Sequence, residues 1–245
     1  MIIFQVAKSG AIAPLLLHAQ SEDMEVGRQA CGALANLAEM ADNQARIAAE
    51  RGVRAIVTVM RSPHVEVQRE SGRALANLAC NADNRMSILA EQIAEAIRTH
   101  QPLPTFPEGL SLANGYELQL EVANLVAPDG FAGIKAGITS KQLQAIFGID
   151  HALLGRLYRH GHLKSGAIVP FIEKQLIECE IGITVDTDGQ PVSAGVALEF
   201  AFAAFSSPSD ATAPNLTAGN VAADKFLTGE QHPWRKSYDD ILIRL

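Results

Sequence analysis

Apolar residues recur with the period of a helix in two separate stretches of the first third of the chain. In each stretch they fall at i, i+4, i+7, i+8 and i+11, a spacing that predicts an amphipathic helix. The two stripes are Val26, Ala30, Ala33, Leu34 and Leu37, and Val67, Ser71, Ala74, Leu75 and Leu78.

The two predicted helices belong to a sequence repeat. The letters ALANLA occur at 33–38 and again at 74–79, and the triplet ADN follows at 41–43 and at 82–84, so both landmarks recur after 41 residues. A period near 40 residues indicates a helical solenoid. A shorter predicted helix precedes Gly10 and another precedes Gly52, since glycine commonly follows the last residue of a helix. We therefore expect units of short helix, glycine turn, helix, loop and long helix.

A third unit begins but is not completed. Positions 84–91 match positions 43–50, but no glycine follows them. An array of about two and a half units is shorter than the three that independent stability usually requires. We expect it to be stabilised by contacts with another chain or with the rest of this one. We place the first domain at residues 1–91 and the second at 92–245.

Beyond Glu91 the pattern changes to mixed helices and strands. Gln101–Gly109, with three prolines, predicts a linker or an extended segment leading into the next domain. Ser111 is placed to cap a helix that ends before Pro128. The other elements expected before residue 170 are a buried strand (132–138), a helix ended by Gly148 (140–147) and a loop (151–166).

The sharpest alternation of the chain lies at 177–186, where apolar side chains occupy the odd positions up to 185. This period of two predicts a strand with one apolar and one polar face, and Glu178 and Glu180 share the polar face. DTDGQ (186–190) predicts a hairpin turn, and the apolar run 196–205 that follows contains one charge, Glu199. Ile- and Val-rich strands mixed with helices indicate an α+β region. The predicted fold class is therefore multidomain, an all-α solenoid followed by an α+β fold.

Composition narrows the functions that fit. The net charge is −7 and 48% of residues are hydrophobic, so we expect a folded, soluble protein without a nucleic-acid or membrane partner. The three cysteines, Cys31, Cys80 and Cys179, are widely spaced and odd in number. This argues against a disulfide framework and a thiolate zinc site, and it favours a reducing compartment. We expect a cytoplasmic protein.

The carboxylates of the alternating strand suggest a binding site for a cation. Glu178 and Glu180 project from the same side of one strand, where two close anions resist ionisation unless a cation lies between them. Glu199 could supply a third oxygen ligand. Such a set of oxygen donors suits Mg²⁺ or Mn²⁺. The alternative is a solvent-facing strand edge without a metal.

The repeated units resemble armadillo repeats, with ALANLA at the position of the third helix of that family. In armadillo proteins the matching asparagine lines a concave groove and bonds the backbone of an extended peptide. The resemblance therefore implies that Asn36 and Asn77 bind a peptide. Two alternatives remain open: each amide bonds a neighbouring repeat, or each faces water.

Seven segments of the remaining chain carry a second resemblance. In order from about Gln92, they are IAEAIRTHQPLP, SLANGYELQ, GIKAGITSKQLQAIFGID, GRLYRHGHL, ECEIGI, ALEF and NLTAGNVAADKFLTG. Together they resemble the 2-keto-4-pentenoate hydratase branch of the fumarylacetoacetate hydrolase superfamily. The resemblance implies that Glu178, Glu180 and Glu199 bind a divalent cation, Mg²⁺ or Mn²⁺, and that Lys135 meets the carboxylate or enolate of the substrate.

The family usually continues beyond the segment that ends here at Ile241–Leu245. The resemblance therefore implies an incomplete hydratase-like fold, truncated at its C-terminus, with ILIRL as an unpaired edge strand.

Two functions follow from these patterns. The first is a metal-dependent lyase, of hydratase or decarboxylase type, that acts on a small 2-oxo acid through an enolate. A metal chelated by the 1-carboxylate and the 2-oxo group would stabilise the charge that develops on oxygen. The second is a non-catalytic interaction module, in which the repeats bind a protein or peptide through Asn36 and Asn77 and the hydratase-like part is a degenerate scaffold.

Overall fold

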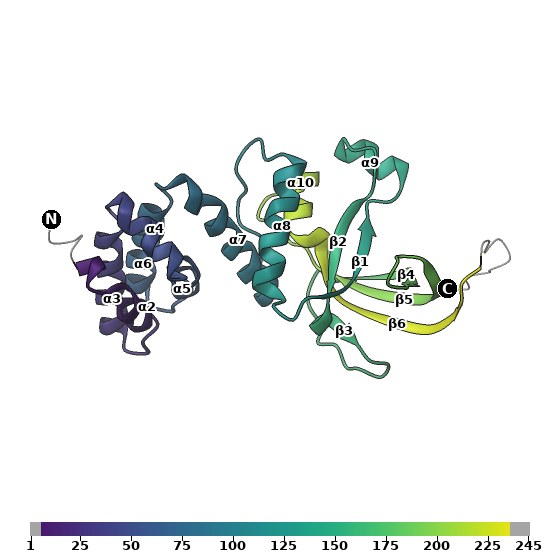
Figure 1. The fold of residues 1–245 in the computed structure, drawn as a ribbon, viewed down its shortest axis with the longest axis horizontal. Coiled ribbons are helices and arrows are strands. Elements are labelled where there is room, and N and C mark those ends of the chain that lie inside the picture. The colour runs from purple at the N-terminus through teal and green to yellow at the C-terminus, as the bar shows by residue number, and fades with distance from the viewer. Residues whose placement is uncertain (1–5, 236–245) are drawn as a thin grey trace.

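The protein consists of a helical N-terminal region followed by an α+β region, as the computed structural model of residues 6–235 shows (Figure 1). A short helical stretch at 6–8 comes first. The helices that follow are α2 (Ile12–Ala19), α3 (Met24–Leu37), α4 (Ala41–Ala49), α5 (Gly52–Val59), α6 (Val65–Leu78) and α7 (Ala82–Thr99).

The expected three-helix unit is present as α4, α5 and α6. Local signals define its counterpart one repeat earlier: Gly10 takes a left-handed φ of 83° after the first helical stretch, and Asp23 caps α3 by accepting from two backbone N–H groups. The prediction that Gly52 directly follows the end of a helix was wrong. Arg51 is the left-handed residue, with φ 60°, and Gly52 begins α5. Glycine is needed there because an added Cβ would lie 2.5 Å from the carbonyl oxygen of Ile47.

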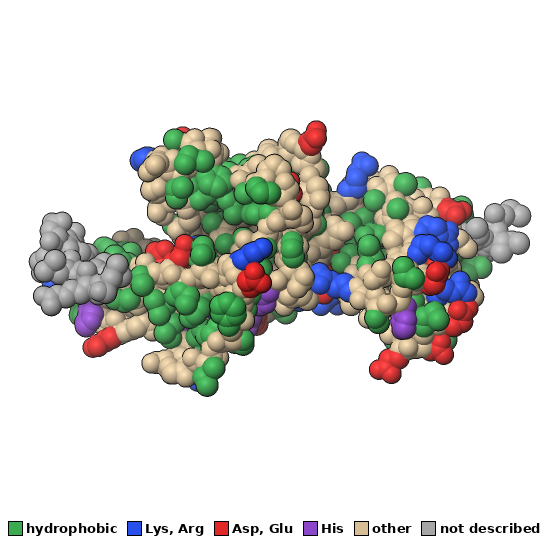
Figure 2. All heavy atoms as spheres, turned by 180° about the vertical axis from the view of Figure 1, so that it is seen from behind, with side chains coloured by type: hydrophobic (Ala, Val, Ile, Leu, Met, Phe, Trp, Pro, Cys, Tyr) green, Lys and Arg blue, Asp and Glu red, His purple; other side chains and the backbone are tan. Residues whose placement is uncertain are grey.

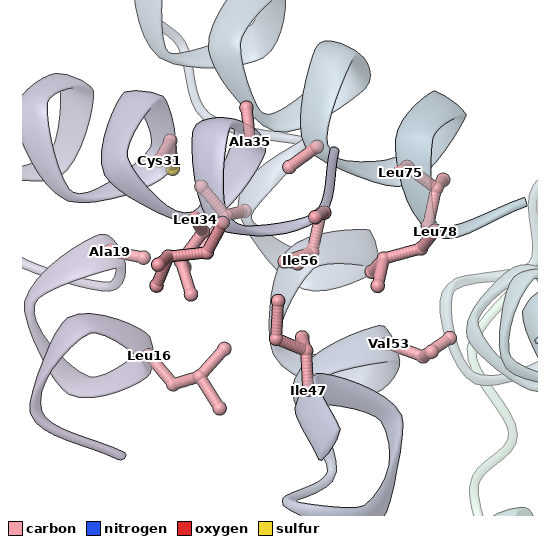
Figure 3. Packing of buried hydrophobic residues seen from close by; sticks show 14 of the residues in the cluster. Leu16, Ala19, Cys31, Leu34, Ala35, Ile47, Val53, Ile56, Leu75 and Leu78 are labelled. Carbon is pink, nitrogen blue, oxygen red and sulfur yellow. The ribbon is translucent and has the colours of Figure 1, made fainter. Parts of the chain in front are cut away.

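The core of the repeats lies between the long helices α3 and α6 and the shorter helices beneath them (Figure 3). Leu34 and Leu78, one from each ALANLA segment, are fully buried together with Ile47 and Ile56. Eight of the ten residues of the two predicted stripes are buried, and Ala33 is partly buried. Val26, at the start of the first stripe, is 40% exposed.

Helix α7 joins the two regions. It starts where the third repeat starts and continues without a break through position 91 to Thr99. Ile88 packs into the core of the repeats, whereas Leu89 and Ile93 pack into a second core with Leu118 of the following helix. The incomplete repeat array is therefore packed against the rest of the chain through one continuous helix, which contributes to both cores.

The second region contains short helices and two sheets. Its elements, in chain order, are α8 (Leu112–Val126), β1 (Phe131–Gly137), α9 (Lys141–Phe147), β2 (Leu153–Tyr158), the 3₁₀ turn η1 (Arg159–Gly161), β3 (His162–Leu163), β4 (Leu176–Val185), β5 (Pro191–Ala201), η2 (Pro208–Asp210), α10 (Ala213–Ala218), η3 (Asn220–Ala222) and β6 (Ala223–Pro233).

The two sheets differ in size. Strands β1 and β2 form an antiparallel two-stranded ribbon. The larger sheet has the order β3-β6-β5-β4, in which β6 pairs in parallel with the short β3 and antiparallel with β5. Among the described residues, β4 therefore lies at one edge of this sheet.

Several local predictions for this region are confirmed. Ser111 caps α8, Gly148 ends α9 with a left-handed φ of 66°, and the 186–190 segment forms the hairpin turn between β4 and β5. The proline-rich segment leads into the second core, where Leu103 and Phe106 are buried. None of the described helices has the length and apolar character needed to cross a membrane.

Two local predictions were wrong. The segment 151–166 is not a loop, because it holds β2 and β3. The strand predicted at 132–138 exists as β1, but it is not buried. A two-stranded ribbon has few neighbours, and its side chains stay partly or fully exposed. The predicted edge strand ILIRL lies outside the described residues.

Candidate metal centre

Hairpin β4–β5 brings the three predicted glutamates together. Glu178 lies directly opposite Glu199 in the antiparallel register, and Glu180 follows two residues later on the same face of β4. One carboxylate oxygen from each residue lies within 4.8 Å of the others. The hairpin turn sets this arrangement, since it returns the chain so that Glu199 meets the pair.

Lys135 reaches the same point from a separate sheet. Its Nζ lies 2.7 Å from Oε1 of Glu199 and 3.9 Å from Oε2 of Glu178. The Lys135 side chain is 10% exposed, so the ammonium is held in a shielded position. Gly155 of β2 pairs with Lys135, and an added Cβ there would lie 3.0 Å from Cγ of the lysine. The glycine leaves room for the lysine stem.

An asparagine on η3 holds the β1–β2 ribbon in place. The buried side chain of Asn220 accepts from the backbone N–H of Arg156 at 2.7 Å and donates to its carbonyl at 2.8 Å. Asn220, Val221 and Ala222 all have positive φ values, a conformation that costs energy for residues other than glycine. The ribbon that carries Lys135 is thus fixed against the start of β6 by a strained turn.

Burial dominates the electrostatics of the site. The pKa of Glu199 is raised above its usual value because the carboxyl is removed from water, and the charges of Glu178 and Glu180 raise it further. The hydrogen bond and charge of Lys135 act in the opposite direction. Three carboxylates beside one ammonium leave two negative charges uncompensated when all are ionised. A divalent cation would neutralise them.

Comparison with known proteins finds two separate likenesses. Residues 2–39 match the family model described as Armadillo/beta-catenin-like repeat. No curated protein has a significantly similar sequence. Two solved structures of 4-oxalocrotonate decarboxylase from Pseudomonas putida G7 have a similar fold. One, with magnesium and adipate, matches at a TM-score of 0.52 and 21% identity. The other, with calcium and acetate, matches at 0.52 and 22%.

Each match covers 60% of this chain, and 63% or 62% of the decarboxylase chain. This chain therefore spans less than two thirds of the decarboxylase length. At this identity the likeness concerns the fold. The chain thus combines a segment that matches the armadillo-repeat model with a fold similar to that of the decarboxylase.

The three glutamates suit a hard divalent cation. The carboxylate cluster contains only oxygen donors, which Mg²⁺ and Mn²⁺ prefer. Glu178 and Glu180 are more exposed than Glu199, so the cluster opens to solvent on the β4 side. Water could complete a coordination shell from that direction.

In the helical N-terminal region, Asn36 and Asn77 both lie at the contact between α3 and α6. Oδ1 of Asn36 accepts from Nη1 of Arg73 at 2.8 Å. Nδ2 of Asn77 donates to the carbonyl of Ala35 at 2.9 Å. These contacts belong to the alternative in which each amide bonds a neighbouring repeat. Asn36 remains exposed and Asn77 partly exposed on adjacent helices.

Two further residues share the face of the glutamates: Phe226, which had no sequence signal, and His162, a possible proton carrier to which no pattern assigned a role. Across the larger sheet, Glu178 pairs with Glu199, Glu199 with Phe226, and Phe226 with His162. The His162 ring stacks on Phe226 at 4.5 Å, and its Nε2 lies 3.1 Å from Oγ1 of Thr228. The row depends on a parallel β3–β6 pairing between segments more than 60 residues apart. Local patterns do not reveal such a pairing.

Proposed function

We propose that the protein is a metal-dependent lyase that acts on a small 2-oxo acid through an enolate. The observation that carries the proposal is the convergence of Glu178, Glu180 and Glu199 with the ammonium of Lys135 beside them. The similar fold of a decarboxylase whose structures contain magnesium or calcium supports the same reaction class. The finer choice between hydration and decarboxylation depends on the substrate.

Each residue has a defined task in this proposal. The three carboxylates hold Mg²⁺ or Mn²⁺ on the face of β4 and β5. A divalent cation at this point supplies the Lewis acid that stabilises negative charge on the 2-oxo oxygen. Lys135 neutralises the anionic end of the substrate and stabilises the enolate charge from the other side. Phe226 lies one strand away from Glu199 on the same face, and His162 lies one strand further. The rest of the substrate would extend over these two residues.

The test measures formation of the enolate rather than turnover of one chosen substrate. In D₂O with Mg²⁺ or Mn²⁺, the protein should catalyse exchange of the C3 hydrogens of a simple 2-oxo acid such as 2-oxobutanoate, measured by NMR. Exchange should stop when the metal is removed with EDTA. If the metal-loaded protein exchanges C3 hydrogens no faster than buffer with metal does, the lyase proposal is wrong.

A second function, binding of an extended peptide by the repeats, is favoured by the armadillo match over residues 2–39. Asn36 and Asn77 lie on adjacent long helices, and α3 and α6 pack directly against each other. Equivalent amides one repeat apart are suited to the regularly spaced carbonyl and N–H groups of an extended chain.

This second function predicts a specific loss. Peptides selected on the wild-type protein from a phage library of random 12-mers should bind at least tenfold more weakly to the double variant Asn36→Ala, Asn77→Ala. Thermal stability should fall only modestly, because the variant loses two hydrogen bonds, from Arg73 to Asn36 and from Asn77 to Ala35, each worth about 1 kcal/mol or less. The exposed Asn124→Ala on α8 is the control. Equal binding by the double variant would exclude a role for the two amides.

A further inference from the structure

A row of side chains leads across the larger sheet from the candidate metal centre. Glu180 pairs with Ala197, and Ala197 pairs with Thr228 of β6. Residues directly opposite each other on antiparallel strands point to the same face, so all three side chains stand on the face that carries the glutamates. Only the small side chain of Ala197 separates the carboxylate from the threonine hydroxyl along this row.

The row ends at a threonine–histidine pair. Nε2 of His162 lies 3.1 Å from Oγ1 of Thr228, and the His162 ring stacks on Phe226 with an angle of 2° between the ring planes. The stacking fixes the position of the imidazole, yet His162 and Thr228 are both exposed. The pair therefore presents a fixed imidazole and an adjacent hydroxyl to any molecule held on this face.

A glycine keeps the row accessible from the open side of the metal centre. Gly182 follows Glu180 on the same face of β4. A Cβ added to Gly182 would lie 3.3 Å from Cβ of Ala197 and 3.9 Å from Cγ2 of Thr228. A larger side chain at this position would lie on both residues, whereas glycine leaves the way from the carboxylates to the hydroxyl uncovered by β4.

The other face of the same strands offers no comparable groups. On that face Ile177, Ile181 and Ile183 are each more than half exposed. Seen from behind, hydrophobic side chains gather over this end of the molecule (Figure 2). The hydroxyl groups of β4, β5 and β6 belong to Thr184, Ser193 and Thr228, and all three lie on the glutamate face. Polar recognition by these strands is thus confined to the face of the metal centre.

The spacing of the strands sets the length of a ligand that reaches from the metal to the threonine–histidine pair. Adjacent strands lie about 4.8 Å apart, so Thr228 is roughly 10 Å from Glu180 across the sheet. A metal–oxygen bond of about 2.1 Å covers part of this distance. Four extended carbon atoms beyond a 2-oxo group nearly cover the rest.

The charges of hairpin β4–β5 disfavour a second anionic group on the ligand. Every charged residue between positions 176 and 201 is acidic. A divalent cation would offset the three glutamates but would leave no surplus positive charge for a carboxylate at the far end. A hydroxyl group can both donate and accept a hydrogen bond, so it suits the neighbouring hydroxyl and imidazole of Thr228 and His162.

We propose that Thr228 and His162 bind a hydroxyl group at the far end of the substrate, so that the protein selects 2-oxo acids of about six carbons with an uncharged polar tail. The inference rests on the proposed lyase function, because the metal centre must hold the carboxylate and 2-oxo end of the same molecule. The carbon chain then lies over Ala197, beside Phe226.

Three acids that differ only at C6 test the proposal: 6-hydroxy-2-oxohexanoate, 2-oxohexanoate and 2-oxoadipate. Their dissociation constants would be measured by calorimetry on the full chain with Mg²⁺, with 2-oxobutanoate as the short reference acid. Exchange of C3 hydrogens would be followed by NMR on the same samples.

The variants separate the parts of the row. Thr228→Val removes the hydroxyl at nearly constant size, and His162→Phe keeps an aromatic ring on Phe226 but removes the hydrogen bond. The matched control is His232→Phe, since His232 is exposed on the same strand but pairs with Ala194, on the other face. Gly182→Val covers the row, and circular dichroism would check its fold.

The hydroxy acid should bind about three- to tenfold more tightly than the other two six-carbon acids, the effect of about one hydrogen bond. Thr228→Val and His162→Phe should each remove most of this preference, and His232→Phe should keep it. Gly182→Val should weaken all three six-carbon acids by about tenfold, the effect of an overfilled site. It should leave binding and exchange of 2-oxobutanoate unchanged, because the short acid ends before the row.

Several results would overturn the proposal while the lyase function stands. One is that 2-oxobutanoate binds and exchanges, but the six-carbon acids bind equally or 2-oxoadipate binds most tightly. Another is that the preference for the hydroxy acid survives both Thr228→Val and His162→Phe. A third is that Gly182→Val weakens 2-oxobutanoate as much as the longer acids. If no acid binds or exchanges in the presence of metal, the lyase function and this inference are both wrong.

Discussion

Adding Mg²⁺ or Mn²⁺ at a hundredfold excess over its dissociation constant is expected to raise the free energy of unfolding by about 2.7 kcal/mol. The gain arises because the native state alone brings Glu178, Glu180 and Glu199 to one point. Glu180→Gln keeps the size of the side chain but removes one of the three charges, so it should abolish most of this gain. Urea unfolding with metal and with EDTA measures both quantities.

The matched control is Glu230→Gln. Glu230 is an exposed carboxylate on β6 that is not part of the carboxylate cluster, so its substitution changes the net charge equally and should leave the metal-dependent gain intact. A gain that survives Glu180→Gln, or a wild-type protein that neither metal stabilises, would show that the three carboxylates do not form a metal site.

Replacing Lys135 with methionine is expected to slow metal-dependent C3–hydrogen exchange by about 100- to 1000-fold, the effect seen when one donor to a developing oxyanion is removed. Methionine preserves most of the stem but has no charge. The stabilisation by metal should be at least as large as in the wild type, because the ammonium that lies 2.7 Å from Glu199 no longer competes for that carboxylate. NMR exchange rates and urea unfolding separate the two effects.

Lys164→Met tests whether any lost lysine would have the same effect. Lys164 is exposed in the loop between β3 and β4, and its substitution should leave exchange unchanged. Either of two results with Lys135→Met would contradict the assigned role. If exchange stays at the wild-type rate, Lys135 does not act on the substrate. If exchange and metal stabilisation disappear together, Lys135 maintains the site rather than the reaction.

Local patterns were sufficient for the repeats and for two of the three carboxylates. The 41-residue period places the long helices, because each repeat presents the same apolar stripe to its neighbour. The period of two in β4 puts Glu178 and Glu180 on one face whatever the rest of the fold does. The turn at 186–190 then makes Glu199 a near neighbour, since a hairpin fixes the register of its two strands.

Long-range packing decided the remaining features. Lys135 reaches Glu199 only because the ribbon of β1 and β2 is fastened by Asn220, a residue 85 positions further along the chain. Helix α7 passes through position 91 because each of its faces finds a separate core. No periodicity signals either arrangement.

The sequence by itself determined which side chains share a face, because that follows from the residue period of each helix or strand. It determined the isoleucine–valine face of β4 as fully as the glutamate face. Only the tertiary structure decided that the glutamate face meets a lysine while the apolar face lies open among the described residues. The reason is physical: a strand's alternation defines two faces, but which of them is covered depends on what other segments pack there.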